Sequence, residues 1–111
     1  MVKLMLVLLS FVSTVSFAGD CKNVFQTWVD LNTRQGFKPD GQEPIGQVGV
    51  VLIMASGKDV QAILFVVKQP QVTAFFDSEV RKGKLKEGGI CTVEGQPHAY
   101  YFGPIEENPR T

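Results

Sequence analysis

Apolar residues recur at helical spacing in the segment that follows residue 20. Four of them lie three, four, seven and ten positions after the first, and the set is Cys21, Val24, Phe25, Trp28 and Leu31. This spacing puts all five on one helical face. Asp20 is a favourable N-cap because its carboxylate can accept hydrogen bonds from free backbone N–H groups, and Gly36 ends the pattern. We therefore expect a helix over residues 21–34 whose aromatic side chains lie in the core.

The next segments change from a loop-like composition to a strand-like pattern. Residues 36–47 contain two Pro and three Gly, which predicts a long loop. This loop is either a functional element that carries Phe37 or a rigid crossover between the helix and a strand. Two apolar runs of eight residues, 48–55 and 60–67, flank a four-residue polar break. They predict a β-hairpin.

Three further strands are predicted in the second half of the chain. Residues 72–76 are rich in β-branched and aromatic side chains and predict a third strand. Residues 77–89 are polar and hold three Gly, which makes a regular helix unfavourable. Shorter strands are expected over 90–94 and 98–102, on either side of a Gly-Gln-Pro turn.

One helix followed by about five closely connected strands is typical of an α+β domain. We expect the N-terminal helix to pack on a curved antiparallel sheet of four to five strands, held by one disulfide. The domain is predicted to span residues 19–103. A leader over residues 1–18 precedes it, and a loose tail over 104–111 follows it.

The predicted hairpin strands are apolar on both faces, unlike a sheet with one face in water. In strands, the adjacent pairs Phe75-Phe76 and Tyr100-Tyr101 also point to opposite faces. One helix can cover only one of these faces. The second face could be covered by the sheet closing on itself, by a second copy of the chain, or by a different protein.

The first 18 residues and the two cysteines indicate an exported protein. Met1–Ala18 has one Lys, an apolar run and small residues at Ser16 and Ala18, which predicts a secretory signal cleaved after Ala18. This run is too short and too rich in Ser to span a membrane. Cys21 and Cys91 are then expected to form a structural disulfide in an oxidising compartment. The bacterial periplasm is favoured, with eukaryotic secretion as the alternative.

Charge and motif content exclude several function classes. The chain has 11 basic and 11 acidic residues, so nucleic acid is not an expected partner. One His and two cysteines in a disulfide cannot build a zinc site, and we expect no metal and no cofactor. No Gly-x-Ser-x-Gly, His-Glu-x-x-His, P-loop or Gly-x-Gly-x-x-Gly motif occurs. His98, the only His, leaves an enzyme centred on that residue as a minor alternative.

These observations favour a non-enzymatic exported protein-binding module of the inhibitor, immunity or exclusion type. The partner is another envelope or secreted protein, or a second copy in a homodimer. An accessory subunit of a cell-envelope assembly is the alternative. The aromatic candidates for binding are Phe37, Phe76, Tyr100 and Tyr101. The basic run 81–86, if extended, puts three lysines on one side: Lys82, Lys84 and Lys86. This row could meet lipid phosphates, an anionic glycan or an acidic protein surface.

Overall fold

The computed structural model describes residues 20–105, which form two helices and a five-stranded sheet. The elements in chain order are α2 (Cys21–Arg34), β2 (Lys38–Ile45), β3 (Gly49–Ser56), β4 (Asp59–Val67), α3 (Pro70–Arg81), β5 (Lys86–Val93) and β6 (Gln96–Ile105). The predicted leader over 1–18 lies outside the described residues. Neither helix is long and apolar enough to cross a membrane.

Helix α2 has the predicted boundaries and the predicted caps. The Asp20 carboxylate accepts a hydrogen bond from the backbone N–H of Lys22 at 2.8 Å. At the other end, Gly36 adopts a φ of 94°, a conformation that glycine tolerates without strain. The backbone N–H groups of Gly36 and Phe37 then donate to carbonyls of the last helical turn, both at 3.0 Å. This paired arrangement satisfies groups that the helix end would otherwise leave free.

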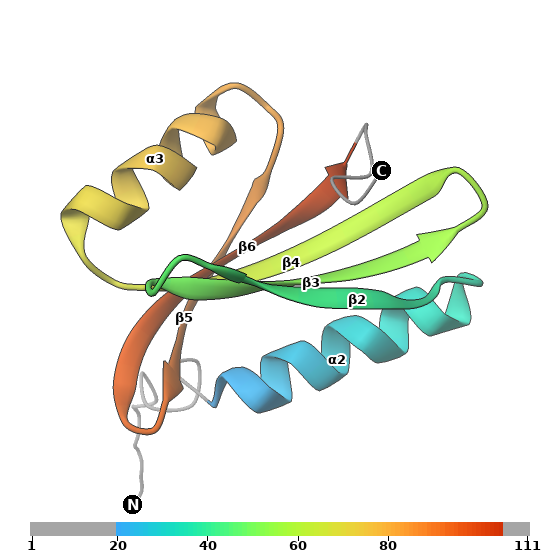
Figure 1. The fold of residues 1–111 in the computed structure, drawn as a ribbon, viewed down its shortest axis with the longest axis horizontal. Helices are drawn as coiled ribbons and strands as arrows, with labels where there is room; N and C mark the ends of the chain where they lie inside the picture. The colour runs from blue at the N-terminus through green and yellow to red at the C-terminus, as the bar shows by residue number, and fades with distance from the viewer. Residues whose placement is uncertain (1–19, 106–111) are drawn as a thin grey trace, which may run out of the picture.

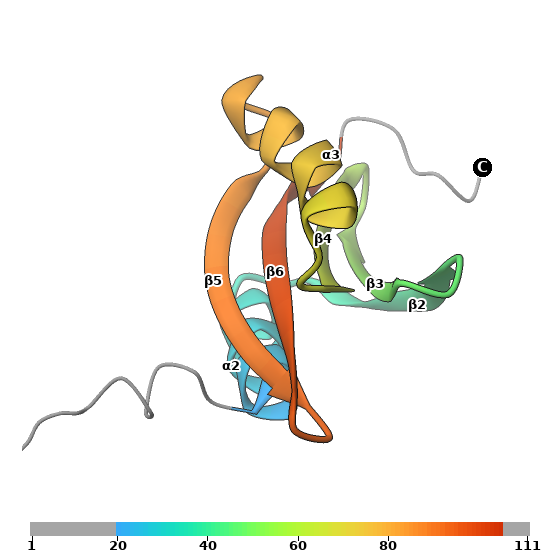
Figure 2. The same cartoon turned by 90° about the vertical axis from the view of Figure 1, so that its left-hand side faces the viewer.

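The sheet is open and wholly antiparallel, with the strand order β2-β3-β4-β6-β5. The predicted α+β class is therefore confirmed, and so is the central hairpin, in which Leu52 of β3 lies opposite Ile63 of β4. The helices α2 and α3 lie on opposite sides of the sheet (Figure 1). In the perpendicular view the sheet bends, because β5 and β6 run steeply while β2 and β3 turn away from them (Figure 2).

The predicted loop over residues 36–47 is wrong for most of its length, because Lys38–Ile45 forms the edge strand β2. Six of its eight residues are exposed, so its polar composition suits an edge. Proline has no N–H to donate and is tolerated on an edge strand, which accommodates Pro39 and Pro44. The register also shifts between Pro39 and Gly41. Such an irregularity protects a free edge from pairing with other chains.

The predicted strand over residues 72–76 is also wrong, because Pro70–Arg81 forms helix α3. Pro70 lies in the first helical turn, where its missing N–H costs nothing. Val72, Phe76 and Val80 are spaced by four residues, and all three pack into one cluster against the sheet. Helical spacing therefore outweighed the β-branched composition of this short run, and the polar residues that follow extend the helix to Arg81.

The domain has one hydrophobic core on each side of the sheet. On the α2 side, the buried residues of the cluster are Cys21, Trp28, Met54, Ile63, Phe65 and Cys91. On the α3 side they are Leu64, Val66, Phe76, Ala99 and Tyr101. Helix α3 thus covers part of the second apolar face that the sequence predicts. The sheet does not close on itself, since β2 and β5 remain as edges.

The predicted disulfide is confirmed between Cys21 and Cys91, whose Cα atoms are 4.9 Å apart. It joins the first turn of α2 to the edge strand β5, and next to it Asp20 pairs with Thr92 in a short parallel bridge. Closing a loop of this length removes about 4 kcal/mol of unfolded-chain entropy in the usual model. The start of α2 is therefore fixed covalently at one edge of the sheet.

The last two predicted strands exist but are longer than expected. They form β5 and β6, and β6 continues through Pro104 to Ile105, where a loose tail was predicted. Ile105 lies opposite Val60 of β4 in the register. Residues 106–111 lie outside the described residues.

Candidate functional site

Two of the predicted binding aromatics are core residues that hold α3 on the sheet. Phe76 of α3 and Tyr101 of β6 are 9% and 1% exposed. Their rings stack with centroids 5.5 Å apart and planes at 29°. The Tyr101 hydroxyl also donates a hydrogen bond to Oδ1 of Asp77 at 2.8 Å. Burial, with the hydrogen bond to Asp77 as a second cause, raises the pKa of Tyr101 well above its ordinary value.

The other two predicted aromatics lie on the α2 side of the sheet. Phe37 and Tyr100 are half-buried and pack against the α2 core. The Tyr100 ring lies 5.9 Å from that of Phe65 and also covers Gly88 of β5. A Cβ atom at Gly88 would overlap Tyr100 ring atoms, so this glycine makes room for the ring. The structure therefore divides the four aromatics between two sides of the sheet instead of bringing them together.

The three predicted lysines do not form the single row that an extended segment would give. Lys82 is the C-cap of α3, and Gly83 turns the chain with a φ of 79°. The Lys84 N–H donates back to the carbonyl of Glu79 at 3.0 Å, which makes a tight turn. Lys82 and Lys84 border one hollow, whereas Lys86 belongs to β5. Lys82 also forms an ion pair with Glu79, with Nζ and Oε2 3.2 Å apart.

Phe75 is the exposed aromatic that the sequence-based choice of Phe76 missed. Its side chain is 64% exposed, the largest value among the exposed large apolar residues of the described segment. The Phe75 ring meets Phe76 edge to face, with centroids 5.1 Å apart and planes at 87°. The helical spacing of Val72, Phe76 and Val80 was the available signal, because it puts Phe75 outside the inward-facing stripe.

Phe75 and the two lysines border a concavity of about 690 Å³, here called the α3 hollow. Its lining residues come from α3, from the turn that follows α3 and from the end of β6. The side chains that define it are Phe75, Glu79, Lys82, Lys84, Leu85 and Ile105. Apolar surface and positive charge therefore meet in one concave place, which is a usual property of a recognition site.

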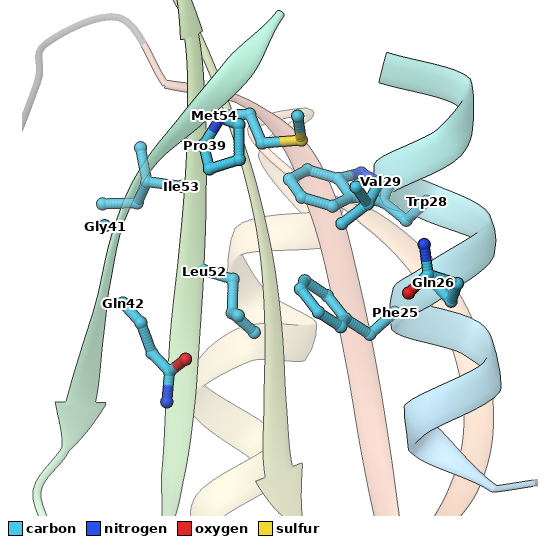
Figure 3. A pocket seen from close by; sticks show the side chains of 10 residues that line it. All are labelled: Phe25, Gln26, Trp28, Val29, Pro39, Gly41, Gln42, Leu52, Ile53 and Met54. Atoms are coloured by element: carbon cyan, nitrogen blue, oxygen red, sulfur yellow. The ribbon is translucent and has the colours of Figure 1, made fainter. Parts of the chain in front are cut away.

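A second, smaller concavity of about 280 Å³ lies between α2 and the strands β2 and β3. In Figure 3, Phe25 of α2 and Leu52 of β3 face one another, and Met54 lies near Trp28. None of the residues that line it is charged. Trp28 and Met54 are only 8% and 2% exposed, so this groove is the open flank of the α2 core. It offers fewer polar groups for specific recognition than the α3 hollow.

His98 and the acidic side chains are the remaining residues whose chemistry the sequence raised. The Nδ1 atom of His98 lies 3.1 Å from the backbone carbonyl oxygen of Gln96 in the β5–β6 turn region. Within residues 20–105, no group of three or more His, Cys, Asp or Glu side chains is arranged to hold a metal ion.

Comparisons with known proteins add no assignment. The chain matches no family model, no curated protein and no solved structure.

Proposed function

We propose that this chain is an exported, non-enzymatic protein-binding module of the inhibitor, immunity or exclusion type. It binds a partner protein through the α3 hollow. The observation that carries the proposal is the 64% exposure of Phe75, an aromatic side chain that is also held in place by its neighbour.

A held aromatic side chain is well suited to anchor an interface. Aromatic residues dominate binding energy when they enter a partner's pocket. The edge-to-face contact of Phe75 with Phe76 restricts the exposed ring, so less side-chain freedom is lost on binding. Phe76 in turn stacks on Tyr101, whose hydroxyl bonds to Asp77. A series of contacts therefore connects the exposed Phe75 ring to the sheet.

Export is supported by two independent features. The Cys21–Cys91 disulfide is compatible with an oxidising compartment. The N-terminal pattern of one Lys, an apolar run and small residues is typical of a cleaved signal. Together they favour the periplasm as the place where the partner is met.

The proposal is tested by placing the photo-crosslinker p-benzoylphenylalanine at position 75 in the cells that make the protein. A matched control carries it at Leu31, which is 51% exposed but lies on α2, on the other side of the sheet. We expect one discrete protein adduct at position 75 and not at position 31. Excess wild-type protein should suppress it, and excess Phe75→Ala protein should not. The same adducts at both positions, or none at position 75, would overturn the proposal.

A further inference from the structure

We infer that the α3 hollow recognises an acidic segment of its partner, in which carboxylates flank an apolar side chain. This inference rests on the proposed function of the hollow and names the chemistry of the partner.

The charge of the hollow favours an anionic ligand. Two lysines and one glutamate line it. Glu79 is already engaged by Lys82, at 3.2 Å, and Asp77 is engaged by Tyr101. Lys84 is exposed, and no carboxylate within residues 20–105 forms an ion pair with it. The hollow therefore presents an ammonium group whose natural counterpart is a carboxylate from outside.

The apolar part of the hollow specifies what should accompany that carboxylate. Phe75 contributes exposed ring surface, and Leu85 and Ile105 are half-buried beside it. An ion pair in water contributes only about 0–1 kcal/mol, which is too little to select a partner by itself. An apolar side chain that enters the hollow would exclude water from the ion pair and strengthen it. The partner segment therefore needs both a carboxylate and an apolar side chain close to it.

The turn after α3 fixes the backbone at the two lysines. Gly83 adopts a φ of 79°, and the N–H groups of Gly83 and Lys84 donate to helix carbonyls at 2.9 and 3.0 Å. The backbone of the cationic turn is therefore ordered before any ligand binds. Such preorganisation favours recognition of a defined segment over general attraction to negative charge.

An anionic membrane fits these observations less well than a protein segment. Lipid surfaces are typically recognised by clusters of four to eight cations. The α3 hollow offers two lysines and a glutamate. Its concave shape also admits side chains, whereas a bilayer is broad and contacts protruding surfaces.

The test begins with a phage-displayed library of random dodecapeptides, panned on the purified protein. Recovered peptides are synthesised, and their affinity is measured by fluorescence polarisation at low and high salt. The variants are Phe75→Ala and the double variant Lys82→Gln/Lys84→Gln. The control is Lys22→Gln/Lys68→Gln, which removes two exposed lysines that do not line the α3 hollow. Intact disulfide and unchanged Trp28 fluorescence establish that each variant is folded.

We expect the recovered peptides to hold Asp or Glu beside an apolar residue. Affinity should fall about tenfold in the Lys82→Gln/Lys84→Gln variant, because the ion pair of Lys84 with the ligand is lost and the Glu79 carboxylate, no longer paired with Lys82, repels the acidic ligand. The control should bind as the wild type does. Binding should also weaken in 0.5 M salt, because screening reduces attraction between exposed charges.

The outcomes separate this inference from the proposal on which it rests. The recovered peptides could instead lack carboxylates, lose affinity for the Phe75→Ala variant and keep their affinity for the lysine variant. This result would overturn the inference and leave the proposed function standing. Peptides that bind wild type and Phe75→Ala equally, or failure to recover any peptide, would overturn both. Vesicles containing phosphatidylglycerol serve as the second probe. If the protein binds them through Lys82 and Lys84 while no acidic peptide binds, the protein segment is the wrong occupant.

Discussion

Tyr101 of β6 and Asp77 of α3 are joined by a hydrogen bond of 2.8 Å across 24 positions of the chain. It is a polar contact between α3 and the sheet, and its α3 partner directly follows Phe76 in the helix. The aromatic stack of Phe76 on Tyr101 accompanies it. The position of Phe75, the proposed anchor for partner binding, therefore depends on this part-buried hydrogen bond and on the aromatic stack.

Removing the Tyr101 hydroxyl should loosen α3. Tyr101→Phe leaves the part-buried Asp77 carboxylate without this donor, and a lost hydrogen bond of this kind costs about 1–3 kcal/mol. We expect the free energy of unfolding, measured by urea titration, to fall by this amount. Tyr100→Phe removes a hydroxyl from the other side of β6 and serves as the control. Equal stability of Tyr101→Phe and wild type would contradict the docking role.

Alkaline pH should destabilise the wild type more than Tyr101→Phe. The pKa of Tyr101 is raised in the folded state, whereas an unfolded tyrosine ionises near pH 10. The stabilisation is therefore complete below about pH 10 and is lost as the pH rises toward the folded-state pKa. Above pH 10 the difference in unfolding free energy between the two proteins should shrink by about 1.4 kcal/mol per pH unit. Parallel stability curves would show that Tyr101 ionises equally in both states.

Substituting Gly88 by a larger residue should lower the free energy of unfolding because of one neighbour, Tyr100. The Cβ of Gly88→Ala would overlap the Tyr100 ring, so the ring or β5 must shift, at about 1–3 kcal/mol. In a Tyr100→Ala background the same substitution should cost much less. A double-mutant cycle measured by chemical denaturation gives this coupling. An equal cost in both backgrounds would assign the effect to the backbone of β5 instead of to the ring.

Loss of the disulfide should weaken the whole domain. The Cys21→Ala/Cys91→Ala variant frees the start of α2 from β5, and the chain-entropy model gives a loss of about 4 kcal/mol. Trp28 is the only tryptophan and is 8% exposed in the α2 core, so its fluorescence follows unfolding directly. An unchanged urea midpoint would mean that other contacts alone fix α2.

Processing of the N-terminus is a direct test of export. The mature protein recovered from the envelope should begin at Gly19, which intact-mass measurement and N-terminal sequencing detect. Replacing Ala18 by a bulky residue should block cleavage, since the site requires small residues. A protein that keeps Met1 in its native compartment would contradict the predicted signal.

Sequence reasoning succeeded where two independent signals agreed. For α2, helical spacing, the Asp20 cap and the Gly36 stop all indicated the same boundaries, and the structure confirms them. For the central hairpin, two apolar runs and a polar turn agreed in the same way. The missed β2 lacks such a pattern, because an exposed edge strand has little apolar surface to bury.

The candidate site was only half predictable for a related reason. The basic run made Lys82, Lys84 and Lys86 candidates as one extended row. In the structure only Lys82 and Lys84 border the α3 hollow, because they flank one turn. The choice between Phe75 and Phe76 depends on whether their segment is a strand or a helix. In a strand either ring can face outward, whereas in a helix the alignment of Phe76 with Val72 and Val80 fixes the answer. The hydrogen bond between Asp77 and Tyr101 joins residues that are 24 positions apart, so no local sequence pattern predicts it.

The strand order has a consequence for the order of folding. The last strand in chain order, β6, lies inside the sheet, between β4 and β5. Strands β4 and β5 therefore form no hydrogen bonds with each other and are joined only through β6. A chain synthesised from its N-terminus must therefore have released all of β2 to β6 before the sheet can be completed. Until Gln96–Ile105 emerges, β4 and β5 present open backbone edges to the surroundings. The period of exposure to misassembly thus ends only with the last residues of the domain.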